Sequence, residues 1–155
     1  VAICRDRQLL AGTMNAAAVY VGNEPDAQMH LGLEFSRRGR GIAFWAVMHA
    51  LGRDGIAALV ERYCDLAGDI RTRCEALGLV VLNRGVFNQV LCTLADPDRV
   101  PAYVAAIQAN GVSWFGTTLC QGKPALRISV SSWRTREEHI ERLAGELERA
   151  LADLA

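Results

Sequence analysis

One arginine lies in the middle of an apolar strand pattern, and it is the residue in this sequence best suited to hold a ligand. Arg127 lies within Ala125–Val130 and has apolar residues on either side. A guanidinium in such a strand needs an acceptor, and a carboxylate that accepts two parallel hydrogen bonds is the natural one. From the pattern alone, an outward-facing strand arginine without a ligand is the commoner interpretation.

A second basic feature is the cluster Arg37, Arg38 and Arg40, which stands directly before an apolar segment. Cations at the start of a helix oppose the helix dipole, so such a cluster calls for a reason. Two interpretations remain open: a solvated helix start, or an interface where an acidic partner meets the three arginines.

The remaining chemistry-bearing residues do not form a recognisable site. The histidines and cysteines show no CxxC pair and no mutual spacing typical of a metal site, so no metal is expected. Each cysteine stands within an apolar pattern, so free, buried thiols in a reducing cytoplasm are the expected state. The residues concerned are His30, His49, His139, Cys4, Cys64, Cys74, Cys92 and Cys120.

Hydrophobic periodicity predicts an α+β arrangement that would position these residues. A long loop is expected over 11–34. The predicted helices are a mostly buried one over 40–51, then 55–77, 100–109, and one that starts at a Thr135–Glu138 capping box and runs toward Leu154. The predicted strands are 79–82, 89–94, 112–117 and 125–130, with a turn at Gln121–Pro124. Together they indicate an antiparallel sheet with helices on one face.

Composition restricts the class of protein. The 155 residues are 51% hydrophobic and 22% charged, and seventeen basic residues balance seventeen acidic ones. A neutral chain gives no reason to expect nucleic acid or an anionic membrane as partner. No apolar run of bilayer length and no signal peptide is recognised, so a soluble, cytoplasmic protein is expected. Because the chain starts at Val1, we expect it to begin inside a longer protein.

Several segments, in order and spacing, resemble one enzyme family. Ser36–Trp45 and Leu51–Gly55 are similar to a stretch of the group II pyridoxal-phosphate (PLP)-dependent amino-acid decarboxylases, and Leu126–Thr135 resembles the family's closing strand and its turn into the last helix. Arg5–Arg7 and Tyr20–Val21 fall where the family has a charged turn and a tyrosine-containing loop. The likeness spans nearly the whole chain but is not specific to one substrate.

The resemblance implies a fold and a division of the chain. Residues 1–54 would be the end of a fold type I PLP large domain with a mobile loop and a linking helix, and 55–155 a small C-terminal α+β domain. The chain would thus be part of a homodimeric carboxy-lyase whose substrate is an amino acid. A departure at Ala43, where the family often has lysine, weakens any subfamily assignment.

The resemblance also implies roles for particular residues. Tyr20 would be the catalytic-loop tyrosine that protonates the substrate carbon, and Arg127 would bind the substrate α-carboxylate at the edge of the small domain, facing the large domain. The Schiff-base lysine would lie upstream, because the chain's single lysine, Lys123, stands in a turn. The isolated chain is therefore expected to be inactive. The alternatives are a stand-alone α+β interaction module, or part of a PLP enzyme with another reaction such as transamination.

Overall fold

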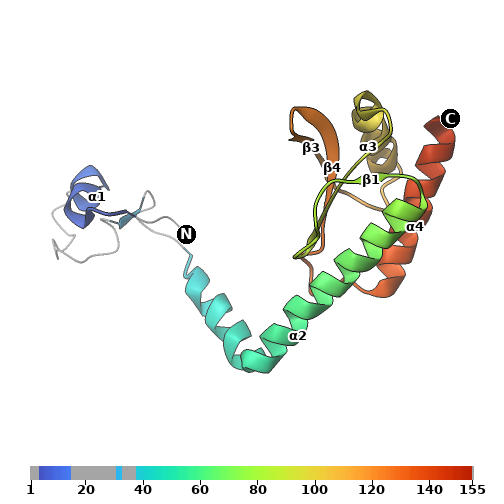
Figure 1. Ribbon diagram of the computed structural model, residues 1–155. Helices are drawn as coiled ribbons and strands as arrows, with labels where there is room; N and C mark the ends of the chain where they lie inside the picture. Colours follow the sequence, from blue (N-terminus) through green and yellow to red (C-terminus); the bar gives the residue numbers. More distant parts are fainter. Residues whose placement is uncertain (1–3, 15–30, 33–37, 155) are drawn as a thin grey trace. The chain divides into compact units, whose positions relative to one another are not determined.

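The computed structural model describes residues 4–14, 31–32 and 38–154 and divides the chain into two compact units, Val1–Ala50 and Leu51–Ala155 (Figure 1). The described helices are α1 (Arg7–Met14), α2 (Arg40–Ala76), the 3-10 helix η2 (Pro97–Arg99), α3 (Val100–Ala109) and α4 (Glu137–Leu154). The strands are β1 (Val80–Val81), β2 (Gln89–Thr93), β3 (Gly116–Cys120) and β4 (Lys123–Ser129).

Helix α1 was not predicted, and it occupies the start of the segment expected to be a loop over 11–34. Asp6 caps it, because its Oδ1 accepts the backbone N–H groups of Gln8 at 2.9 Å and Leu9 at 3.0 Å. An N-cap of this kind satisfies donors that a helix start leaves unpaired. Residues 15–30 of the expected loop lie outside the described part of the chain.

Helix α2 leaves helical geometry at Gly52, where φ is 62° and ψ is −171°. Only glycine adopts this conformation readily, which agrees with the break predicted between residues 51 and 55. The prediction of a mostly buried helix before that break was wrong for this chain. Every residue of 40–51 is exposed, including Phe44 and Trp45 at 69% and 64%.

Among the described residues, α2 is the one helix long and apolar enough to cross a membrane by length and composition, with a mean hydropathy of 1.2 in its most apolar window. A span needs about 20 consecutive helical residues. Because Gly52 interrupts the helix, its apolar stretch from Arg40 to Leu51 is shorter than that. A helix that is apolar all round is the kind that packs inside a larger protein.

The second unit contains an antiparallel sheet in the order β1-β2-β4-β3 (Figure 1). Its core gathers one face of β2 and β4 with the apolar sides of α2, α3 and α4. The fully buried members include Ile70, Val90, Tyr103, Leu126 and Leu147. Helices thus cover one face of an antiparallel sheet, which confirms the predicted α+β class.

Local signals explain where these elements end. After α2, Gly78 has φ 80°, and the N–H groups of Gly78 and Leu79 donate to the carbonyls of Glu75 and Cys74, the pattern of a Schellman cap. Helix α3 has the predicted bounds, and a positive-φ glycine, Gly111, follows it.

The third predicted strand was misplaced. We expected 112–117, but β3 runs from Gly116 to Cys120 and joins β4 through Gln121 and Gly122. Both turn residues have positive φ, 51° and 78°, as a two-residue type I′ hairpin requires. The Gln–Gly pair therefore sets the register, and Lys123 is the first residue of β4.

The predicted capping box at Thr135 was also displaced by one residue. Helix α4 begins at Glu137, and the backbone N–H of Arg136 donates to Nδ1 of His139 at 3.1 Å. A histidine three residues into the helix thus makes the return bond that a glutamate usually makes. Its Nδ1 is an acceptor here, so a neutral His139 carries its proton on Nε2.

Candidate functional site

The face of the sheet opposite the helices carries Arg127. Along β4, Leu126 and Ile128 are buried in the core, whereas Arg127 between them is exposed. Successive strand residues point to opposite faces, so Arg127 projects from the face that the helices leave open. It lies on an inner strand of the sheet, between β2 and β3.

The register places Arg127 in one row with Leu91 of β2 and Gly116 of β3. Directly opposite residues project from the same face, so the arginine has a leucine side chain on one flank and no side chain on the other. Leu91 is half-buried. The flank toward β3 is therefore the less obstructed approach to the guanidinium.

The rest of this face is uncharged around Arg127. The neighbouring rows pair Gln89 with Ser129, and the fully buried Ala125 with Thr118. No ion pair or hydrogen bond of the Arg127 side chain occurs among the described residues. The arginine is thus a cation on an open surface without a carboxylate of its own, which is an arrangement suited to binding an anion.

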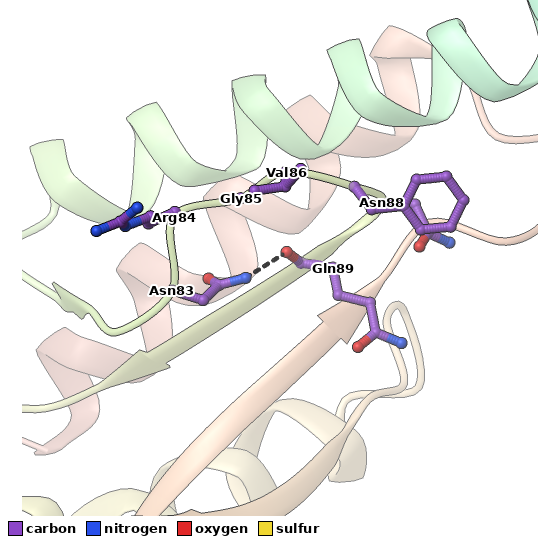
Figure 2. Close-up of a pocket in the computed structure, with 7 residues that line it drawn as sticks. Asn83, Arg84, Gly85, Val86, Asn88 and Gln89 are labelled. Carbon is purple, nitrogen blue, oxygen red and sulfur yellow. Dashed lines mark hydrogen bonds between the residues drawn. The ribbon is translucent and has the colours of Figure 1, made fainter.

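The loop between β1 and β2 fixes the start of β2 and so the position of that row. The Asn83 side chain donates to the Gln89 carbonyl at 2.9 Å and accepts the Leu91 N–H at 3.0 Å (Figure 2). At the other end, the Asn88 side chain donates to the Val130 carbonyl at 2.7 Å. Asn83 therefore continues the β1 side of β2 beyond β1, and Asn88 extends the β2–β4 pairing beyond the strands.

The same loop encloses an open hollow of about 470 Å³ lined by Asn83–Gln89. The side chain of Asn83 turns toward Gln89, and that of Arg84 points away from it (Figure 2). Because the asparagine amide is already bonded to the loop's own backbone, the hollow presents no set of converging polar groups to a ligand.

An arginine of α2 is hydrogen-bonded to the backbone of this loop. Arg71 donates to the carbonyl of Gly85 at 3.1 Å, and Gly85 has φ 61°. A Cβ at residue 85 would lie 1.3 Å from the Arg71 guanidinium nitrogen Nη2. The close contact and the positive φ both demand glycine at this position.

The other predicted site residues lie in the first unit, at the hairpin turn or outside the described residues. Tyr20 and Arg37 lie outside the described residues. Arg38 and Arg40 are exposed at the start of α2, in the first unit. Lys123 is exposed beside the hairpin turn and is paired with Cys120, as expected of a lysine that is not desolvated for nucleophilic chemistry.

The cysteines are free thiols, as predicted, but the prediction that they are buried holds only for Cys74 and Cys92. Cys64 and Cys120 are half-buried, and Cys4 is exposed. Sequence reasoning missed the contact of Cys74 with Cys92. The interaction of the two thiols raises the pKa of Cys92 and lowers that of Cys74, and burial raises the pKa of the neighbouring Tyr103. The shifts of Cys92 and Tyr103 favour their protonated forms, and both side chains pack in the core.

The fold so described occurs in solved enzymes. The chain superposes on Oryza sativa TDC with PLP and tryptamine with a TM-score of 0.79 and 16% identity, covering 97% of this chain and 34% of that one. It superposes on Catharanthus roseus tryptophan decarboxylase in complex with L-tryptophan with a TM-score of 0.75 and 16% identity, covering 95% of this chain and 34% of that one.

A third such structure is the glutamate decarboxylase domain of diaminobutyrate-pyruvate transaminase and L-2,4-diaminobutyrate decarboxylase from Vibrio parahaemolyticus. Its TM-score is 0.62 at 13% identity, and the alignment covers 81% of this chain and 28% of that one. These neighbours are group II PLP-dependent decarboxylases. The chain has the fold of their C-terminal part and spans about a third of their length. No protein-family model and no curated protein matches its sequence.

Proposed function

We propose that this chain is the C-terminal part of a PLP-dependent amino-acid decarboxylase, in which Arg127 binds the α-carboxylate of the substrate. The observation that carries this proposal is the exposed guanidinium on the uncovered sheet face, with no acidic partner among the described residues. The match of nearly the whole chain to the C-terminal part of such enzymes supports it.

The geometry of arginine suits this task. A guanidinium can donate two parallel hydrogen bonds to one carboxylate, each worth about 1.5–3 kcal/mol when the groups are charged. Arg127 is anchored in the backbone pairing of β4 with both β2 and β3. The strand therefore holds the base of the side chain in place, and less ordering is left for the moment of binding.

The exposed apolar segment of α2 supports the view that the chain works inside a larger enzyme. Ile42, Phe44, Trp45, Val47 and Met48 are all exposed, although a helix that is apolar all round normally packs in a protein interior. A stand-alone α+β module, the alternative of another class, would leave this surface in water. A cytoplasmic homodimer is the assembly that we propose for the parent.

The PLP of the parent enzyme would be held by residues outside this chain. The single lysine, Lys123, is exposed at the hairpin and lies beside no described acidic group that would pair with the cofactor. The described residues therefore do not form a PLP site, and the cofactor would supply the electron sink for the reaction. We accordingly propose that the chain alone neither retains PLP nor decarboxylates an amino acid.

On the resemblance alone, we also propose Tyr20, which lies outside the described residues, as the group that protonates the substrate carbon in the intact enzyme. In the intact enzyme, Tyr20→Phe should lower kcat while the dissociation constant of PLP stays unchanged, because phenylalanine keeps the ring and removes only the hydroxyl. Carbon dioxide release and PLP titration measure the two quantities. An unaltered kcat would refute the role of the hydroxyl.

The parent's reaction is tested by assaying the intact enzyme with PLP and a panel of amino acids that includes L-tryptophan, L-glutamate and L-2,4-diaminobutyrate. Release of one carbon dioxide per amine formed is the expected result. Formation of a keto acid without carbon dioxide would instead identify a transaminase with the same fold. In parallel, the isolated chain should lose all PLP absorbance on gel filtration, and retained stoichiometric PLP would contradict its proposed dependence on the rest of the enzyme.

A further inference from the structure

Gly116 is a glycine that the described structure does not otherwise explain. It is the first residue of β3, and its φ lies outside the left-handed region that favours glycine. A Cβ placed on it would meet no atom within 4 Å, so close packing does not exclude a side chain. Glycine in a strand costs stability, about 0.5–1 kcal/mol relative to alanine, and it often marks a place where a ligand approaches the backbone.

The location of Gly116 indicates which ligand would use the space that its missing side chain leaves. Residue 116 is directly opposite Arg127, so a side chain there would project from the same face and lie against the arginine. The other flank of Arg127 is occupied by Leu91. A carboxylate that forms two hydrogen bonds with a guanidinium must lie in its plane, and the flank toward β3 is the one with room for it.

We infer that Gly116 keeps the β3 flank of Arg127 open and that the substrate carboxylate reaches the guanidinium across this glycine. Gly116 is therefore a positioning residue for the substrate, because its lack of a side chain leaves the carboxylate room to lie in the plane of the guanidinium. This inference rests on the proposed function of Arg127.

The test compares substitutions in the intact, PLP-loaded enzyme. Gly116→Val should raise KM for the amino acid substrate about tenfold or more, the loss expected when one of two charged hydrogen bonds is broken. Gly116→Ala should have a smaller effect in the same direction. The inhibition constant of the product amine, which lacks the carboxylate, should stay within about twofold for both variants.

The control is Thr118→Ile, which adds bulk to the same strand and the same face but opposite Ala125 instead of Arg127. It should leave KM unchanged.

Thermal unfolding provides a second readout, because Gly116→Ala removes the conformational cost of glycine and should keep or raise the unfolding temperature. A weaker substrate complex in a protein of equal or higher stability separates positioning from a structural role.

An unchanged KM in Gly116→Val, with the fold intact, would overturn the inference, as would equal losses in amino-acid and amine binding. If Gly116→Val does not fold, the same comparison is made with Gly116→Ala, where an unchanged KM overturns it. Arg127→Gln in the same assay separates the two proposals. If it leaves KM unchanged, the carboxylate role of Arg127 fails; if it raises KM and Gly116→Val does not, only the role of Gly116 fails.

Discussion

The contact between Arg71 and Gly85 allows a prediction of stability whose magnitude follows from the structure. Gly85→Ala would place a methyl group 1.3 Å from Nη2 of Arg71, so the arginine must swing away. It would then lose its hydrogen bond to the Gly85 carbonyl, now 3.1 Å long. Because Arg71 is half-exposed, the low end of the range for charged hydrogen bonds applies, about 1.5 kcal/mol.

The backbone adds a second cost. Gly85 has φ 61°, and a residue with a Cβ pays about 1–2 kcal/mol in that region. The two contributions predict that Gly85→Ala lowers the free energy of unfolding by about 3 kcal/mol. At a urea m-value near 1.5 kcal/mol/M, the unfolding midpoint would fall by about 2 M.

A double-mutant cycle with Arg71→Ala isolates the contact. In the Arg71→Ala background the methyl group meets no guanidinium, so Gly85→Ala should cost only the backbone contribution, about 1–2 kcal/mol. The coupling energy would be about 1.5 kcal/mol, measured by urea unfolding of the full chain followed by circular dichroism. Equal costs of Gly85→Ala in both backgrounds would refute the assignment of the loop's position to Arg71.

Two further predictions concern the packing of α4. Tyr103→Phe should lower the free energy of unfolding by about 1 kcal/mol, because the buried hydroxyl donates to the Leu147 carbonyl at 2.8 Å. Tyr63→Phe, at a half-buried ring, is the control in the same urea titration. An equal loss of stability in Tyr63→Phe would contradict the reasoning. The Arg149 guanidinium, 2.9 Å from Glu146, lowers the pKa of that carboxyl in the folded protein. Its stabilising contribution is then present above the unfolded pKa, about 4.3, and is lost as pH falls through the folded pKa. Glu146→Gln should therefore lose less stability than the wild type between pH 6 and pH 3. Equal losses of unfolding free energy in the two proteins would argue against a stabilising Glu146–Arg149 pair.

Elements with clear boundary signals were predictable from the sequence. Asp96–Pro97 and Asn110–Gly111 bracket α3, and its predicted bounds agree with the structure. Gly78 marked the end of α2 for the same reason. The strand predicted over 112–117, by contrast, was misplaced, because the positive-φ turn at Gln121 and Gly122 determines the register of β3.

Burial and flanking contacts were harder to predict. The apolar pattern of 40–51 indicates a helix that packs against other apolar surfaces, but it does not say that those surfaces belong to this chain. In the structure all of its residues are exposed. The pattern around Arg127 predicted a strand arginine without saying what lies beside it. Leu91 and Gly116 are brought to it by strand pairings across 36 and 11 residues of sequence (127 − 91 and 127 − 116), which local periodicity does not encode.

The most direct test of the account is the effect of Arg127→Lys on substrate binding in the intact, PLP-loaded enzyme. Lysine keeps the charge but cannot form the planar two-bond contact, so KM for the amino acid should rise about tenfold or more, a loss of at least about 1.4 kcal/mol. The inhibition constant of the product amine should remain unchanged, and so should the circular dichroism spectrum. A KM within twofold of the wild type, or an equal loss of amine binding, would contradict the proposal that Arg127 holds the substrate carboxylate.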